Sequence, residues 1–307
     1  MPHTPESISD AAQNYLTEAY ASVNYPAYPP LDDTAAWESM IAQGDADLIA
    51  RFSGIELPVT TELLEFDGVP VYRIVPEGAD ESGPIFLDIH GGALIVGGGE
   101  ACQKMGEAIA LTRGMVTWAV DYRMPPSHPY PAGLDDCVVA YRALLAQREP
   151  SEIFVGGASA GGNLAAALIV RIKEEGLAMP AGLVLLTPEV DLTQSGDSFT
   201  TLRGLDVLLD DLMAPNLLYA GGADLKDPHL SPLFADHAGF PPTFIQCGTR
   251  DLFLSNAVRM HRSLRAAGVP AELHLWEAMP HGGFGGMSPE DFEVGAEVRA
   301  FLDRLRS

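Results

Sequence analysis

Basic residues are scarce in this chain. Its 307 residues include only 18 Lys and Arg against 42 Asp and Glu, which gives a formal net charge of −24. A surface that binds nucleic acid needs clustered Lys and Arg to neutralise phosphates, so no nucleic acid is expected as a partner. Acidic side chains favour solubility, and adaptation to salt or repulsion of anionic substrates is the alternative source of this charge.

Cysteines and long apolar runs are also few. Cys102, Cys137 and Cys247 are scattered and odd in number, which argues against a disulfide framework or a CxxC metal site and favours reduced, buried thiols. No run of about 18 apolar residues is present to span a membrane, and the N-terminus lacks the basic start and apolar run of a secretory signal. We therefore expect a cytoplasmic protein with no membrane partner.

A hydrophobic core is expected, because 47% of the residues are apolar and only 20% are charged. From about residue 60 onward, short apolar β-branched runs alternate with helix-length amphipathic segments, which is the pattern of a mostly parallel sheet covered by helices. Runs such as IFLDI and GLVLLT are apolar throughout, as in strands buried on both faces. The expected strands are Leu63–Phe66, Val69–Val75, Ile85–His90, Val116–Asp121, Ile153–Gly157, Leu183–Thr187, Thr243–Cys247 and Glu272–Trp276.

Two segments interrupt this alternation, one up to about residue 55 and the other at about 191–223. Both have helical patterns, and in the second segment apolar side chains recur at helical spacing. The two segments could form a cap, or they could only cover hydrophobic sheet surface; periodicity alone does not decide between these interpretations. The side chains at helical spacing are Leu205, Leu208, Leu209, Leu212 and Met213.

The segment IFVGGASAGGNLAAAL places a G-x-S-x-G pattern between an apolar strand and an alanine-rich helix. The bare pattern arises by chance, but this strand-turn-helix setting is the one that a nucleophile elbow requires. Small neighbours allow a tight turn that lifts the hydroxyl of Ser159 above the sheet, beside a helix N-terminus that favours developing negative charge. Ser159 is therefore the predicted nucleophile.

A serine nucleophile needs a base that removes its proton and an acid that orients the base. Asp251 lies in QCGTRD just beyond one expected strand, and His281 lies in MPHGGF on a glycine-rich turn after another. Taken singly, Asp251 could be a helix N-cap and His281 an ordinary turn residue. The chain order Ser, Asp, His, with each residue after a strand, is the order of an α/β-hydrolase, so we predict a triad of Ser159, Asp251 and His281.

The run LDIHGGALIVGGGE ends a further expected strand with adjacent glycines. Acyl transfer needs backbone N–H donors for the oxygen that becomes negative in the tetrahedral intermediate, and glycines offer such donors without side-chain obstruction. A phosphate cradle would need a helix and a nearby Lys or Arg, which favours the oxyanion interpretation. The predicted donors are the N–H groups of Gly91, Gly92 and Ala160, and His90 is expected to shape the loop.

These motifs resemble the hormone-sensitive lipase family of α/β-hydrolases, in particular its bacterial esterases. The resemblance extends from about Pro84 to Phe301. It rests on HGGA at His90, DYRMPPSHPYPAGLDD from Asp121, GASAGGNLA from Gly157, DPHLSPL from Asp227, GTRD ending at Asp251 and MPHGGF from Met279.

The resemblance implies an α/β-hydrolase fold with an eight-stranded, mostly parallel sheet and a helical cap. Residues 1–55 would form the N-terminal part of the cap, and residues 56–307 the catalytic domain, with a cap insertion at about 191–223. Analogy with dimeric relatives allows a homodimer.

The resemblance also implies a carboxylesterase that hydrolyses short- to medium-chain acyl esters of small molecules without a metal or other cofactor. Such an enzyme acts through a serine acyl-enzyme, so the implied roles fall on Ser159, His281 and Asp251. We expect the substrate pocket to be lined by Ala93, Leu205, Leu208, Leu209 and Met213.

The chain departs from the family pattern at three places. Ala93 stands where a third glycine is usual, Ala158 where an aspartate is usual, and Ser255 and Asn256 where acidic residues are usual. None of these changes removes a predicted catalytic group. The Cβ of Ala93 narrows the space beside the oxyanion site, and the loss of acids near Asp251 bears on how the histidine loop is tethered. Substrate range is therefore affected more than reaction type.

Two other functions fit parts of the sequence. A lactonase or amidase uses the same triad on the same scaffold and differs mainly in leaving group and pocket. A ligand-binding protein with an inactive hydrolase site would resemble the gibberellin receptors, but those lack the catalytic histidine that is present here as His281. The sequence does not reveal the natural substrate or the acyl and alcohol preference.

Overall fold

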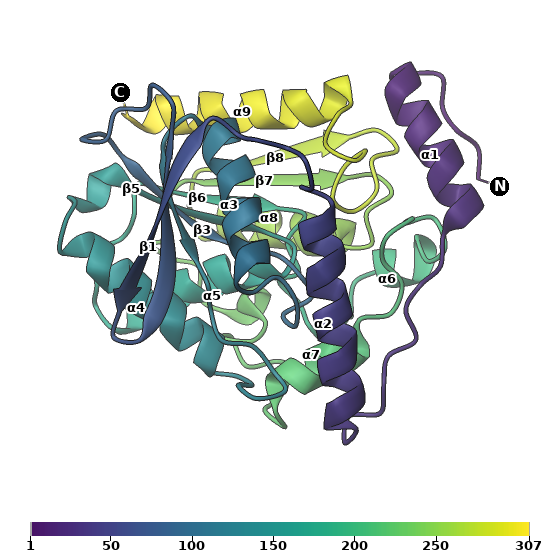
Figure 1. Ribbon diagram of the computed structural model, residues 1–307, viewed down its shortest axis with the longest axis horizontal. Coiled ribbons are helices and arrows are strands. Elements are labelled where there is room, and N and C mark those ends of the chain that lie inside the picture. The colour runs from purple at the N-terminus through teal and green to yellow at the C-terminus, as the bar shows by residue number, and fades with distance from the viewer. Residues whose placement is uncertain (1, 307) are drawn as a thin grey trace.

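An eight-stranded sheet forms the centre of the computed structural model, which describes residues 2–306 (Figure 1). The spatial strand order is β1-β2-β4-β3-β5-β6-β7-β8. β2 is antiparallel to β1 and β4, and the neighbours from β4 to β8 are parallel. The predicted mostly parallel eight-stranded sheet is confirmed. The strands are β1 (Val59–Phe66), β2 (Val69–Pro76), β3 (Ile85–Ile89), β4 (Val116–Val120), β5 (Ile153–Ala158), β6 (Gly182–Leu186), β7 (Thr243–Gly248) and β8 (Ala271–Trp276).

Each strand coincides with a run predicted from the sequence, and the largest difference lies in β1. This strand begins at Val59 instead of Leu63. β1 is an edge strand whose side chains alternate between partly buried and exposed, so its first half carries too few apolar residues to be recognised. β3 and β4, in contrast, are buried at every position, which explains their unbroken apolar sequences.

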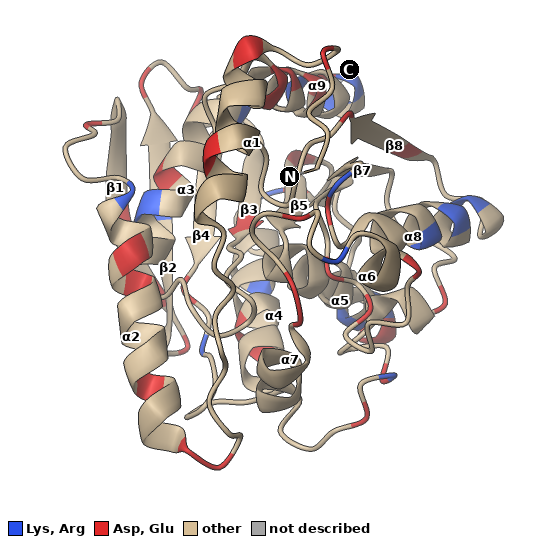
Figure 2. Ribbon diagram, turned by 90° about the vertical axis from the view of Figure 1, so that its right-hand side faces the viewer, with Lys and Arg blue, Asp and Glu red and all other residues tan. Residues whose placement is uncertain are grey.

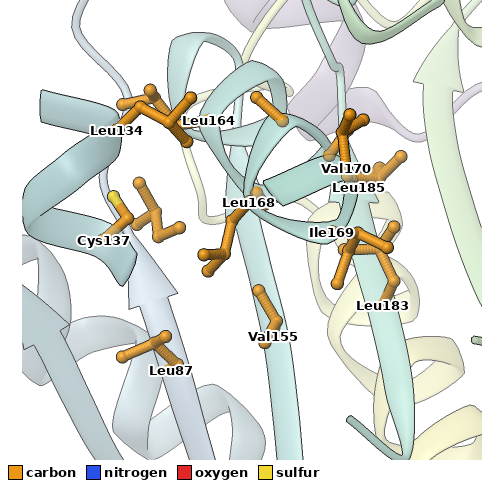
Figure 3. Close-up of a cluster of buried hydrophobic side chains, with 14 of the residues drawn as sticks. Leu87, Leu134, Cys137, Val155, Leu164, Leu168, Ile169, Val170, Leu183 and Leu185 are labelled. Atoms are coloured by element: carbon orange, nitrogen blue, oxygen red, sulfur yellow. The ribbon is translucent and has the colours of Figure 1, made fainter. Parts of the chain in front are cut away.

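Helices cover both faces of the sheet, and strand side chains alternate between the two faces. Leu87 and Val155 belong to the large buried cluster shared with α4, α5 and α8, and Figure 3 shows both on the side of the sheet toward α5. Their neighbours Phe86 and Phe154 pack instead with Phe301 of α9. The helices are α1 (Asp10–Ser22), α2 (Thr34–Ala50), α3 (Glu100–Arg113), α4 (Ala132–Leu145), α5 (Ala160–Glu174), α6 (Ser198–Thr201), α7 (Met213–Ala220), α8 (Leu254–Ala266) and α9 (Pro289–Arg306).

Four helices lie outside this layered arrangement and gather on one side of the molecule (Figure 1). α1 and α2 come from the N-terminal segment, and α6 and α7 come from the segment at 191–223. The two segments touch, because the hydroxyls of Tyr20 and Tyr25 donate to the carbonyl oxygens of Leu205 (2.7 Å) and Asp206 (2.5 Å). Figure 2 views this side and shows that α1 and α2 carry Asp and Glu but no Lys or Arg.

The expectation of a helix through Leu205–Leu212 is wrong. α6 ends at Thr201 and α7 begins at Met213, so four of the five apolar side chains at helical spacing lie in a loop between the two helices. Gly204 has a φ of +75°, and the side chain of Asp206 accepts hydrogen bonds from the N–H groups of Leu208 (2.9 Å) and Leu209 (3.2 Å). Such local side-chain bonds compete with helical ones, which explains why periodicity misled here.

Composition predicted the state of the cysteines correctly. Cys102, Cys137 and Cys247 are all buried and unpaired. Within residues 2–306, no helix combines the length and the apolar character needed to cross a membrane.

Candidate active site

Ser159 occupies a strained turn between β5 and α5. Its φ of +59° and ψ of −120° lie in a region that side-chain-bearing residues seldom adopt. The turn leaves no room for side chains beside it, because a Cβ on Gly157 would lie 2.5 Å from the carbonyl carbon of Gly161. A Cβ on Gly161 would lie 1.9 Å from the carbonyl oxygen of Ile89. Both glycines of the G-x-S-x-G pattern are therefore required by packing.

The structure brings the three predicted triad side chains into one chain of hydrogen bonds. His281 Nε2 lies 2.9 Å from Ser159 Oγ, and His281 Nδ1 lies 3.1 Å from Asp251 Oδ1. Asp251 is fully buried, His281 is 4% exposed, and Asp251 Oδ1 also accepts from the N–H of Phe253 (2.8 Å). With the proton of the neutral ring on Nδ1, Nε2 is left to accept the serine proton.

Three buried carboxyl groups act on His281. Burial lowers the pKa of His281, but the charge and hydrogen bond of Asp251 and the charges of Asp206 and Glu189 outweigh burial and raise it above 6.5. Burial and the Asp251 charge raise the pKa of Asp206 to about 6. Burial raises the pKa of Glu189 to about 8, against a hydrogen bond from Asn216. Sequence reasoning missed Asp206 and Glu189, since a lone acid in a loop carries no signal of burial.

Backbone donors gather beside Ser159. Gly91 and Gly92 follow β3, and a Cβ on Gly91 would lie 2.8 Å from the carbonyl oxygen of Ala158. The carbonyl of Gly92 accepts from the N–H groups of Ile95 (3.0 Å) and Val96 (2.9 Å), which fixes the turn. Across the described residues, the N–H groups of Gly91, Gly92 and Ala160 find no acceptor. They are free to bind an oxyanion.

His90 contacts the backbone of this loop and packs on Tyr122. Its Nδ1 lies 2.7 Å from the carbonyl oxygen of Gly91, and its ring stacks on Tyr122 with centroids 4.1 Å apart. Burial lowers the pKa of His90 to about 4, so the ring is neutral. In the described part of the chain, His90, Cys102 and Asp121 are the one group with metal-ligand chemistry, and their ligand atoms lie within 4.8 Å of one another. Asp121 also accepts from the N–H of Gly99 (2.9 Å), so His90 and Asp121 already bind the glycine loop.

Of the five expected pocket residues, two line a cavity and three do not. Leu208 and Leu209 line a cavity of about 150 Å³, together with Tyr25 and Tyr28 of the N-terminal segment. Ala93 and Leu209 also pack against a buried apolar cluster that consists of Phe199, Leu212, Leu252 and Phe253. Leu205 and Met213 are half-buried and do not line the cavity. The tyrosines were missed because they come from a segment about 180 residues away from the loop they face.

Proteins with similar sequences and structures include esterases and an acetyl-hydrolase. A family model described as alpha/beta hydrolase fold matches residues 86–284. An acetyl-hydrolase of Streptomyces hygroscopicus is 34% identical over 226 residues, covering 70% of this chain and 76% of that protein. The carboxylesterase NlhH of Mycobacterium tuberculosis is 32% identical over 241 residues, covering 74% of this chain and 76% of that protein.

Two solved structures extend the similarity over nearly the whole chain. The crystal structure of esterase E25 has a TM-score of 0.87 and 37% identity, covering 99% of this chain and 97% of that one. An esterase from the bacterial hormone-sensitive lipase family has a TM-score of 0.83 and 32% identity, and each chain is covered completely.

Proposed function

Because the chain belongs to the hormone-sensitive lipase family of α/β-hydrolases and is a carboxylic ester hydrolase, we propose that Ser159, His281 and Asp251 carry out the hydrolysis. The observation that carries this assignment is the buried hydrogen-bond chain from Ser159 Oγ through both ring nitrogens of His281 to Asp251. It joins a nucleophile, a base and an orienting acid in the geometry that acyl transfer requires.

The first half of the reaction acylates the enzyme. Ser159 Oγ attacks the ester carbonyl carbon while His281 Nε2 takes the hydroxyl proton, and Asp251 stabilises the resulting imidazolium. The carbonyl oxygen becomes negative and accepts hydrogen bonds from the N–H groups of Gly91, Gly92 and Ala160. The carbon–oxygen bond to the alcohol then breaks, and the alcohol leaves with the proton from His281.

The second half restores the serine. A water molecule gives one proton to His281 Nε2 and attacks the acyl carbon, which forms the second tetrahedral intermediate at the same three N–H groups. That intermediate breaks its bond to Ser159 Oγ, which takes the proton back from His281. The carboxylic acid leaves.

The proposed substrates are small esters with short- to medium-chain acyl groups. Support comes from Leu209, which lines the cavity of about 150 Å³ between its loop and the N-terminal segment and packs, like Ala93, on the buried cluster that contains Phe253. The cavity is small for a ligand pocket, and Ser159 and His281 do not line it. We further propose that residues 1–55 and 191–223 together form the cap over the site. We also propose that the enzyme is cytoplasmic and, by analogy with relatives, a homodimer. Light scattering of the purified protein would test the dimer.

The test is turnover of a panel of p-nitrophenyl esters from acetate to palmitate, with lactones and an amide added. Ser159→Ala and His281→Ala are each expected to lower kcat by several orders of magnitude with the fold retained. Ser151→Ala and His261→Ala, changes of the same kind away from the site, serve as controls. Retention of more than about a tenth of the ester turnover by Ser159→Ala would exclude it as the nucleophile, and a preference for lactones or amides would change the substrate class.

A further inference from the structure

The residue after Asp251 is held by the segment at 191–223. The N–H of Leu252 donates to Asp206 Oδ2 (2.8 Å), and the carbonyl oxygen of Leu252 accepts from Ser198 Oγ (2.6 Å). The next N–H, that of Phe253, donates to Asp251 itself (2.8 Å). The two carboxylates thus bind consecutive backbone N–H groups, and the turn that carries Asp251 receives two hydrogen bonds from a segment outside the sheet.

A second contact fixes the same segment to the start of α8. Ser198 and Ser255 bond each other reciprocally, since the N–H of Ser198 donates to Ser255 Oγ (2.9 Å) and the N–H of Ser255 donates to Ser198 Oγ (3.0 Å). Gly196 permits this approach, because a Cβ there would lie 2.5 Å from the Ser255 Cβ. Ser255 lies near the place where the family pattern has acidic residues, and here it ties the segment at 191–223 to the Asp251 turn.

Asp206 connects this turn to two further parts of the molecule. Its other carboxylate oxygen accepts from the N–H groups of Leu208 and Leu209, which line the cavity. Its own carbonyl accepts from the hydroxyl of Tyr25. The side chain of Asp206 has no exposed surface, whereas that of Asp211 in the same loop is 56% exposed. One buried carboxylate therefore joins the cavity wall to the predicted triad acid, and its backbone joins both to the N-terminal segment.

We propose that Asp206 is a positioning residue for ester hydrolysis: it holds the Asp251 turn in place and adds a second negative charge near His281. This inference rests on the proposed roles of Asp251 and His281. A negative charge close to His281 stabilises the imidazolium that forms when Ser159 loses its proton.

Among the described residues, the titratable groups that interact with the Asp206 charge include two from the predicted triad and three others. Asp251 and His281 belong to the predicted triad, and the remaining three are Tyr15, Tyr25 and Cys247. The latter three stay neutral near neutral pH, because burial and the neighbouring acids raise each pKa further above its ordinary value. Of these groups, His281 is thus the one whose charge Asp206 stabilises.

Asp206→Asn removes the charge and leaves only one acceptor atom for three N–H groups. With p-nitrophenyl acetate, whose acyl group is the shortest of the panel, kcat is expected to fall about tenfold while KM stays within about twofold. The acid limb of kcat/KM is expected to move to lower pH, because loss of the negative charge lowers the pKa of His281. Ser198→Ala, which removes the two hydrogen bonds of Ser198 Oγ but no charge, should lower kcat about threefold without moving the limb.

Asp224→Asn is the matched control, because Asp224 also accepts from a backbone N–H, that of Lys226 (3.0 Å), but is exposed and does not line the cavity. An unchanged pH limb and kcat in Asp206→Asn, as in Asp224→Asn, would overturn the proposal. If Asp206→Asn does not fold by circular dichroism, Ser198→Ala decides instead, and an unchanged kcat there overturns the positioning role. Asp251→Asn is measured in parallel. Full activity in Asp251→Asn refutes the triad. Loss of activity in Asp251→Asn, together with unchanged activity in Asp206→Asn, refutes only the role of Asp206.

Discussion

Gly161 and Ile89 face each other so closely that a Cβ on Gly161 would lie 1.9 Å from the Ile89 carbonyl oxygen. This contact joins the start of α5 to the end of β3, and therefore the nucleophile turn to the predicted oxyanion loop. The relative position of Ser159 and Gly91 depends on it.

Gly161→Ala should therefore impair both folding and catalysis. The new methyl group meets backbone atoms that cannot move aside without displacing β3, so we expect a loss of about 3 kcal/mol or more in the free energy of unfolding. Any folded fraction should have kcat reduced at least about a hundredfold, because the oxyanion donors shift relative to Ser159. Urea unfolding and p-nitrophenyl acetate kinetics measure the two effects.

Gly295→Ala is the control for this change. Gly295 also lies within a helix, α9, and the nearest atom to its added Cβ is 3.9 Å away. That variant should be as stable as the parent chain or slightly more so, by up to about 1 kcal/mol. Equal behaviour of the two variants would mean that the close contact with Ile89 does not constrain the turn.

The acid limb of the pH profile should lie above the ordinary value for histidine. The carboxylates around His281 stabilise its charged form and raise its pKa above 6.5, so the neutral base needed by Ser159 forms only at higher pH. We expect kcat/KM for p-nitrophenyl acetate to rise along an acid limb whose midpoint lies above pH 6.5. Enzyme returned from each pH to neutral buffer controls for unfolding, and a midpoint below the ordinary histidine value would contradict the effect of these carboxylates.

The sequence predicted the parts of this molecule that depend on local chain geometry. Ser159, Asp251 and His281 were recognisable because each follows a strand, and the strands carry β-branched apolar runs. The helix through Leu205–Leu212 was predicted wrongly, because the local hydrogen bonds of Asp206 replace helical ones. Asp206 and Leu252 are separated by 46 residues of sequence. Hydrophobic periodicity reports only on residues a few positions apart, so it could not predict this contact. The catalytic roles of the three side chains stay predictions until their variants are measured.

Ala93→Gly should change both stability and selectivity. Ala93 has a φ of +52°, a conformation that glycine adopts without cost, so we expect a gain of up to about 1 kcal/mol in the free energy of unfolding. Removal of the Cβ also widens the space beside the oxyanion donors, so kcat/KM should rise more for bulky acyl esters than for acetate.

Asp67→Gly separates these two effects. Asp67 has a φ of +48° in the exposed turn between β1 and β2, remote from the site. Asp67→Gly should therefore alter stability without altering the ratio of rates between esters. A uniform change in kcat/KM across all esters in Ala93→Gly would point to altered oxyanion-loop geometry and contradict the steric explanation.

The last prediction concerns acyl length, which the apolar wall around Leu209 should limit. Leu209 lines the cavity and packs on the buried side chains of Phe199, Leu212 and Phe253. Each methylene that enters such a pocket contributes up to about 0.8 kcal/mol until it meets the wall. By family resemblance, rates should peak at about four to eight acyl carbons and collapse for palmitate.

Leu209→Ala should move the optimum by about two carbons toward longer chains, because it removes three carbon atoms of the wall. Leu217→Ala, at a 39% exposed position in α7, should leave the optimum unchanged. A steady rise in kcat/KM from acetate to palmitate, or activation at an oil–water interface, would mean that the cap segments open as a lid and do not form a fixed wall.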